Sequence, residues 1–155
     1  MDITLDVEDY KLNMRAAAII IHNNKVLLHR NTKSDHYALV GGRIAIGENS
    51  EVTVKREVIE ELGKEIDVTG YVSTIENFFE MKGIKYHEIM FVHKAEFKND
   101  EDKQITAMLN NVEGKDYLQY EWIELDKIEE CPLKPKIVKE VLKEKVFPVH
   151  KINID

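Results

Sequence analysis

The sequence has few of the features that mark secreted or membrane proteins. Cys131 is its only cysteine, so no disulfide can form within the chain. Its longest apolar run is the six residues from Ala16 to Ile21, far below the roughly 18 that a membrane-spanning helix requires. The first ten residues, MDITLDVEDY, are acidic where a secretory signal is basic and then apolar. We therefore expect a cytoplasmic protein without a membrane segment.

Basic charge is also in short supply. Lys and Arg together number 22 against 29 Asp and Glu, which gives a formal net charge of −7. Proteins that coat DNA or RNA need a basic surface for the phosphate backbone, so this balance disfavours bulk nucleic acid as a partner. With 43% hydrophobic and 33% charged residues, the composition is that of an ordinary globular protein. The length of 155 residues predicts a single domain spanning residues 1–155.

Apolar patterning and turn residues predict strands, a helix, further strands and a second helix. Asn23-Asn24 and Lys82-Gly83 each separate two apolar runs and are typical of hairpin turns. The predicted strands are 14–21, 25–30, 37–40, 67–79, 84–97 and 117–125. One helix is predicted between Asn49-Ser50 and Gly63 and another over 136–146, and residues 98–116 are predicted to form a loop. This order favours an α/β fold of the α+β type, in which a mixed sheet packs against helices.

The first predicted helix carries three carboxylates on one patch. At 100° per residue, its apolar residues fall in one arc that we expect to be buried, namely Val52, Val54, Val58, Ile59 and Leu62. Glu57, Glu60 and Glu61 lie together beside that arc, because spacings of three and four bring side chains together on a helix. Such a patch suits a hard divalent cation such as Mg²⁺ or Mn²⁺. By itself it is more typical of a solvated acidic helix face.

The spacing around this helix distinguishes the two interpretations. Gly42 is followed after five intervening residues by Glu48, and after seven more intervening residues by Arg56-Glu57-Val58, then by Glu60-Glu61 and Gly63. This pattern resembles the Nudix box, with Lys64 in place of its usual apolar last residue and Ile66 as the nearest apolar substitute. The resemblance extends over about residues 14–146. It implies a Nudix-like α/β/α sandwich with the mixed sheet between helices.

The resemblance also implies an activity and roles for individual residues. Nudix hydrolases cleave a diphosphate joined to another group, with water attacking phosphorus and Mg²⁺ or Mn²⁺ as cofactor. Glu57, Glu60, Glu61 and the Gly42 carbonyl would hold the metal, and Glu57 can also act as a base. Arg56 and Glu48 would form an ion pair that holds the loop against the helix. We expect a small-molecule nucleotide as substrate: a nucleotide sugar, a dinucleoside polyphosphate or a nucleoside triphosphate.

Further site residues are expected outside the box. Many members of the family carry another acid near the last strand, and the candidates are Glu113, Asp116 and Glu121. Each is also typical of an exposed surface acid. Substrate contacts are expected from Arg30 and Arg43, as cations for phosphate, and from Tyr37, as an aromatic for a base. The alternatives are surface charges and a packed aromatic side chain.

Two other functions use the same fold. One is a regulatory module that binds a nucleotide without turnover, against which the complete set of glutamates argues. The other is a pyrophosphohydrolase acting on RNA 5′ ends, which needs a basic channel that the net charge disfavours. A homodimer is also compatible with the sequence, because the long second hairpin offers a surface for pairing.

Overall fold

The computed structural model describes residues 1–104, 108–145 and 147–155. Its strands are β1 (Thr4–Val7), β2 (Tyr10–His22), β3 (Lys25–Asn31), β4 (His36–Arg43), β5 (Ile66–Met81), β6 (Ile84–Phe97), β7 (Leu109–Asn110), β8 (Leu118–Glu124) and β9 (Val149–Ile154). Its helices are α1 (Ser50–Leu62), α2 (Asp100–Lys103), the 3₁₀ turn Leu125–Lys127 and α3 (Val138–Lys143). The predicted helix end at Val146 lies outside the described residues.

The strands of the described residues form one mixed sheet. Their order is β7-β8-β3-β4-β2-β6-β5-β9, with β1 paired to the outer part of β2. The pairs β2–β6 and β5–β9 are parallel, and the others are antiparallel. Both predicted hairpin turns are confirmed: Asn23, Asn24, Lys82 and Gly83 all have the positive φ that such tight turns require.

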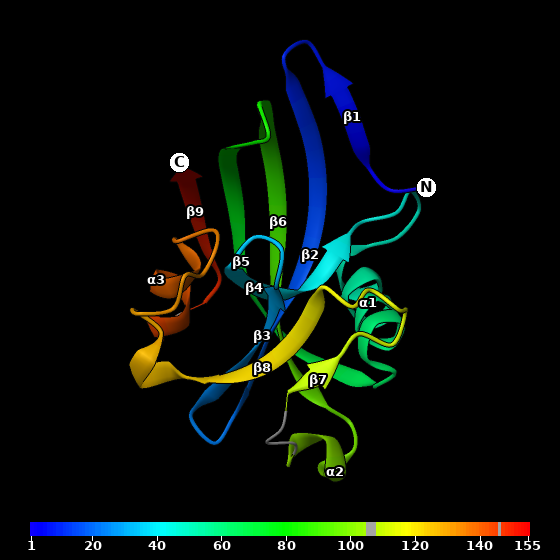
Figure 1. Ribbon diagram of the computed structural model, residues 1–155, viewed down its shortest axis with the longest axis vertical. Coiled ribbons are helices and arrows are strands. Elements are labelled where there is room, and N and C mark those ends of the chain that lie inside the picture. The colour runs from blue at the N-terminus through cyan, green and yellow to red at the C-terminus, as the bar shows by residue number, and fades with distance from the viewer. Residues whose placement is uncertain (105–107, 146) are drawn as a thin grey trace.

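Helices cover both faces of the sheet, as expected for the sandwich (Figure 1). Alternate residues of β2 point to opposite faces, so that Ala16, Ala18 and Ile20 pack against α1. On the other face Ala17 and Ile19 belong to a second core that includes residues of α3. The continuous apolar run of this strand therefore reflects burial on both sides.

Local signals at the two ends of α1 fix its bounds. The Asn49 side chain accepts a hydrogen bond from the Val52 amide at 2.9 Å, and Gly63 ends the helix in the left-handed conformation with φ 65°. Val54, Val58 and Leu62 are buried as predicted. The prediction was wrong for Val52 and Ile59, which are each 48% exposed, because the helix contacts the sheet through a narrower stripe than the arc suggested.

Several short elements were not predicted from the sequence. These are β1, α2, β7 and β9, so the strand predicted at 117–125, which is β8, is not the last one. The inward side chains of β9 include Lys151 and Asn153, and this polar alternation hides the strand pattern. At the box position usually occupied by an apolar residue, Lys64 instead forms an ion pair with Asp102 of α2 at 2.6 Å, and Ile66 is buried. No described helix is long and apolar enough to cross a membrane.

Candidate active site

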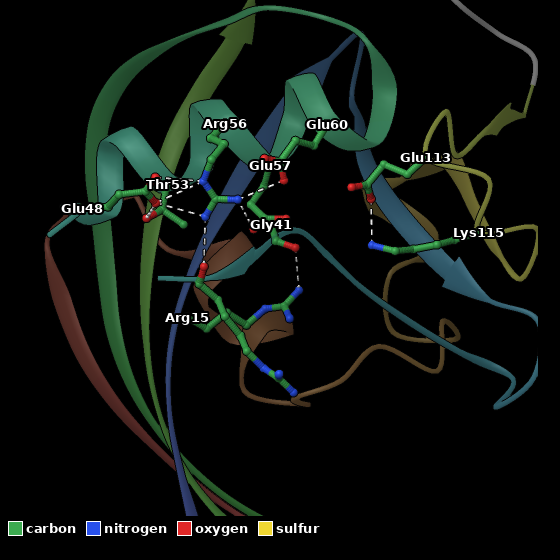
Figure 2. Close-up of polar contacts among 10 residues, drawn as sticks. Arg15, Gly41, Glu48, Thr53, Arg56, Glu57, Glu60, Glu113 and Lys115 are labelled. Atoms are coloured by element: carbon green, nitrogen blue, oxygen red, sulfur yellow. Dashed lines mark hydrogen bonds and ion pairs between the residues drawn. The ribbon is translucent and has the colours of Figure 1, made fainter. Parts of the chain in front are cut away.

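The Arg56 guanidinium joins the loop before α1 to the carboxylates of that helix (Figure 2). Its Nε donates to both oxygens of Glu48 at 3.0 and 3.1 Å, and Nη2 donates to Glu48 Oε2 at 3.0 Å and to the Arg43 carbonyl at 3.2 Å. Its Nη1 donates to Glu57 at 2.8 Å and to Glu60 at 3.0 Å. The Arg56–Glu48 pair predicted from the sequence is therefore present. It holds the pKa of Glu48 below its ordinary value.

Gly42, at the end of β4, lies against Glu57. A Cβ atom at position 42 would overlap the Glu57 carboxyl group, so only glycine allows this side chain to rest on the backbone of β4. The Glu57 side chain is 15% exposed. Burial raises its pKa above the ordinary value, although Arg56 acts in the opposite direction. The contact explains why the motif begins with glycine at this position.

Glu61 is the most buried of the three helix carboxylates, with 5% of the residue exposed. Burial raises the pKa of Glu61 to about 7, while Arg15 and the Tyr120 hydroxyl lower it. Its Oε2 atom has no hydrogen-bond partner within the part of the chain that the structure describes. A buried carboxyl oxygen without a partner is costly, and this atom is a strong candidate for a ligand contact.

Sequence reasoning missed Arg15, which lies on β2 between these carboxylates and a cavity. Its Nη2 donates to the Gly41 carbonyl at 3.1 Å and approaches the Leu39 carbonyl at 3.5 Å. Its positive charge lowers the pKa values of Glu57 and Glu61. The only signal in the sequence was a single arginine immediately before the apolar run that starts at Ala16.

The cavity has a volume of about 370 Å³, within the range of small-molecule sites. Arg15 and Arg43 line it, and side chains of β5 and β6 form much of the remaining wall. Arg43 is thus placed at the cavity as the sequence suggested. Arg30 and Tyr37 do not line it: Arg30 pairs with Asp35 at 3.6 Å, and the Tyr37 hydroxyl donates to Glu121 at 2.9 Å.

The three candidate acids near β8 lie in different surroundings. Glu113 accepts a hydrogen bond from Lys115 at 2.7 Å (Figure 2). Lys115 in turn lowers the pKa of Glu61. The same loop is attached to α1, because the Val112 amide donates to the Glu61 carbonyl at 2.9 Å. Asp116 is exposed, and Glu121 is engaged by Tyr37. Of the three acids, Glu113 is therefore the one linked to the helix carboxylates, through its partner Lys115.

The donor set fits a hard divalent cation, although it is not closed around one point. No three His, Cys, Asp or Glu side chains in residues 1–104, 108–145 and 147–155 are grouped to hold a metal ion, since Arg56 takes up Glu57 and Glu60. All the available donors are oxygens, the kind that Mg²⁺ and Mn²⁺ prefer. The buried, unpartnered Oε2 of Glu61 supports the same assignment.

Comparison with known proteins identifies the class to which this site belongs. The profile of the NUDIX domain matches residues 12–144. The chain therefore belongs to the Nudix family, and it is a Nudix hydrolase, an enzyme class that hydrolyses pyrophosphate linkages. No curated protein sequence matches the chain.

Solved structures share the fold at low sequence identity. A mutator MutT protein from Bacillus halodurans superposes with a TM-score of 0.62 at 22% identity, over 85% of this chain and 80% of that one. A UDP-X diphosphatase gives 0.61 at 20% identity, over 84% of this chain and 59% of that one. An ADP-ribose pyrophosphatase from Streptococcus suis 89-1591 gives 0.62 at 13% identity, over 90% and 98%. These likenesses establish the α+β fold.

Proposed function

We propose that this Nudix hydrolase cleaves the diphosphate linkage of a nucleoside diphosphate joined to another group, with water attacking phosphorus. One observation carries the proposal: the cavity is lined by Arg43, which follows the Gly42 on which Glu57 rests, and by Arg15, which donates to the Gly41 carbonyl. A diphosphate bound by these arginines lies next to the helix carboxylates. The names of the structural neighbours, a UDP-X diphosphatase and an ADP-ribose pyrophosphatase, support substrates of this class.

We infer that Glu57, Glu60, Glu61 and the Gly42 carbonyl hold Mg²⁺ or Mn²⁺. When bound, such a cation neutralises phosphate charge and favours deprotonation of water. Glu60 is the most accessible of the three carboxylates, with its side chain 43% exposed, whereas Glu61 supplies an oxygen from the buried side. Glu113 is our choice for the additional acid, because Lys115 links it to the surroundings of Glu61.

The remaining roles follow from the contacts of the side chains. Arg15 and Arg43 bind phosphate oxygens, and the Arg56–Glu48 pair holds the loop before α1 in place. Glu57 takes a proton from water, and the burial that raises its pKa favours this role in a general base. For Glu57 and Glu60 to hold a cation, Arg56 would have to release them, and its bonds to Glu48 would still hold the guanidinium in place.

A phosphate-release screen tests the proposal. Purified protein is incubated with Mg²⁺ or Mn²⁺ and a panel of nucleoside triphosphates, nucleotide sugars, ADP-ribose and dinucleoside polyphosphates, with coupled phosphatase or pyrophosphatase. We expect turnover of one class, and a loss of at least about 100-fold in Glu57→Gln. Glu51→Gln is the matched control, because Glu51 lies on the same helix but pairs with Lys55.

Absence of turnover across the panel, with nucleotide binding still detected, would contradict the hydrolytic proposal and indicate a binding module. If capped or triphosphorylated RNA, assayed in the same way, were turned over instead, the result would indicate action on RNA 5′ ends. Each outcome is separated from misfolding by thermal unfolding of the same samples.

The cellular setting and assembly are further parts of the proposal. A cytoplasmic location is supported by the single, buried Cys131, which has no disulfide to form. A homodimer is supported by the β5–β6 hairpin, where Met81 and Ile84 are 46% and 42% exposed beside its turn. Light scattering during gel filtration would decide between a monomer and a dimer.

A further inference from the structure

Four buried polar side chains form one row across neighbouring strands. Asn13 of β2 is paired in register with Glu88 of β6, Glu88 with Asn77 of β5, and Asn77 with Asn153 of β9. Their exposed fractions are only 4–7%. Polar groups buried in this way cost free energy unless they are paired or used.

The hydrogen bonds along the row run in one direction, toward the Glu88 carboxylate. Asn153 Nδ2 donates to Asn77 Oδ1 at 2.9 Å, and Asn77 Nδ2 donates to Glu88 Oε1 at 3.2 Å. At the far end, Asn13 Oδ1 has no hydrogen-bond partner among the described residues. The two asparagines thus fix the orientation of a carboxylate whose remaining acceptor capacity is not used by them.

This row lies in the wall of the cavity that Arg15 also lines. Asn13, Asn77 and Glu88 are all lining residues. Arg15 is two residues beyond Asn13 on the same face of β2, and a pair of strand residues spans about 6.8 Å. On β6, Tyr86 lies two residues before Glu88, on the side of the row opposite to Arg15. Its ring stacks in parallel on that of Phe79, with ring centroids 4.7 Å apart. The wall therefore presents a cation, then a carboxylate, then aromatic rings.

A ribonucleotide has the matching order of groups: phosphate, a sugar with two neighbouring hydroxyls, and a flat base. We propose that Glu88 accepts hydrogen bonds from the 2′ and 3′ hydroxyls of a ribonucleoside whose phosphates lie at Arg15 and Arg43. This assignment rests on the proposed function, because it takes the arginines as the diphosphate end. It makes ribonucleoside diphosphate derivatives the substrate class, in preference to the 2′-deoxy forms.

Neighbouring hydroxyls suit this site for a chemical reason. The two oxygens of one carboxylate can accept from two adjacent donors, and bonds to a charged acceptor are stronger than neutral ones. A 2′-deoxy ligand loses one of the two bonds while the carboxylate stays buried. We expect the loss to weaken binding by about 10- to 100-fold.

The test compares binding of α,β-methylene-ADP with that of its 2′-deoxy counterpart, in the presence of Mg²⁺, by isothermal titration calorimetry. The methylene bridge prevents hydrolysis, so the result does not depend on turnover. We expect wild type to favour the ribo form at least 10-fold and Glu88→Gln to reduce the ratio to about twofold. Glu76→Gln is the control, because Glu76 lies on β5 next to Asn77, on the opposite face, and pairs with His150.

Glu88→Gln is nearly isosteric and removes a buried charge, so we expect it to melt no lower than wild type. An equal ribo-to-deoxy ratio in wild type, or the same preference in wild type and Glu88→Gln, would overturn the proposal. The proposal would also be overturned if Glu88 produced a preference for guanosine over inosine diphosphate while the 2′ hydroxyl had no effect on binding. Failure of the hydrolytic function is a separate result, seen as absent turnover with the binding preference intact.

Discussion

Replacing Glu61 by glutamine should change how stability depends on pH in the metal-free protein. Burial raises the pKa of Glu61 from its ordinary 4.5 to about 7. Below pH 4.5 the group is protonated in the folded and unfolded states, so it costs nothing. Above pH 7 it is ionised in both, and the folded state bears the cost of the buried charge. Wild type therefore loses stability as the pH rises from about 4.5 to about 7.

The size of the effect follows from the difference between the two pKa values. At about 1.36 kcal/mol per pKa unit, a difference of about 2.5 corresponds to roughly 3 kcal/mol. Glutamine does not titrate, so relative to wild type Glu61→Gln should gain about 2.5 kcal/mol between pH 5 and pH 8.5, because the wild-type cost is already about 0.8 kcal/mol at pH 5. Any constant cost of burying the amide cancels in this comparison of two pH values.

Urea unfolding in EDTA at pH 5 and pH 8.5, followed by the fluorescence of Trp122, measures this difference. Trp122 is the only tryptophan and packs against the core under α1. Glu51→Gln is the control, because the Lys55 partner lowers the pKa of Glu51 and no change is expected in this pH range. An unchanged difference between Glu61→Gln and wild type at the two pH values would refute the reasoning. Adding Mg²⁺ at pH 8.5 should stabilise wild type more than the variant.

Three other substitutions have distinct expected outcomes. Gly42→Ala should displace the Glu57 carboxylate and reduce turnover at least tenfold. The melting temperature should change little, because the flexible end of the Glu57 side chain can move aside. Turnover equal to that of wild type would contradict the contact. Gly41→Ala should instead destabilise the fold by about 2–5 kcal/mol in urea unfolding, since its Cβ would overlap the Ala16 carbonyl and φ is 153°. Arg56→Ala should lower both melting temperature and turnover. Because Arg56 lowers the pKa of Glu48, the loss of stability relative to wild type should shrink as the pH falls below about 4.5. A loss of stability that does not depend on pH would argue against this pair.

Features that depend on neighbouring residues in the chain could be predicted from the sequence. Asn49 and Gly63 mark the ends of α1 through their own backbone and side-chain preferences, and both act as predicted. The spacing from Gly42 to Glu61 fixes which carboxylates share a helix face. It does not fix their burial: Glu61 lies under the loop after β7 and beside Tyr120, and neither contact has a local signal.

Features that depend on the pairing of distant strands could not be predicted. The row from Asn13 to Asn153 exists because β2 lies parallel to β6 and β9 parallel to β5 in one particular register. A shift of one residue in either pairing would turn the polar side chain to the other face. In the sequence each of these residues is an isolated Asn or Glu within a strand, which is why Glu88 became a functional candidate only in the folded chain. The same holds for Arg15, a single arginine before the apolar run of β2.

The position of Asp155 has a practical consequence for protein engineering. Its amide donates to the Phe78 carbonyl at 2.9 Å, and its side chain lines the cavity. Any peptide joined after this residue, whether an affinity tag or a fused reporter, begins at the rim of the cavity. At the other end, the Met1 carbonyl accepts from the Ile46 amide in the loop that leads into α1. Purification tags at either end should therefore be cleaved before substrates are ranked, or the ranking will describe the tag as well as the enzyme.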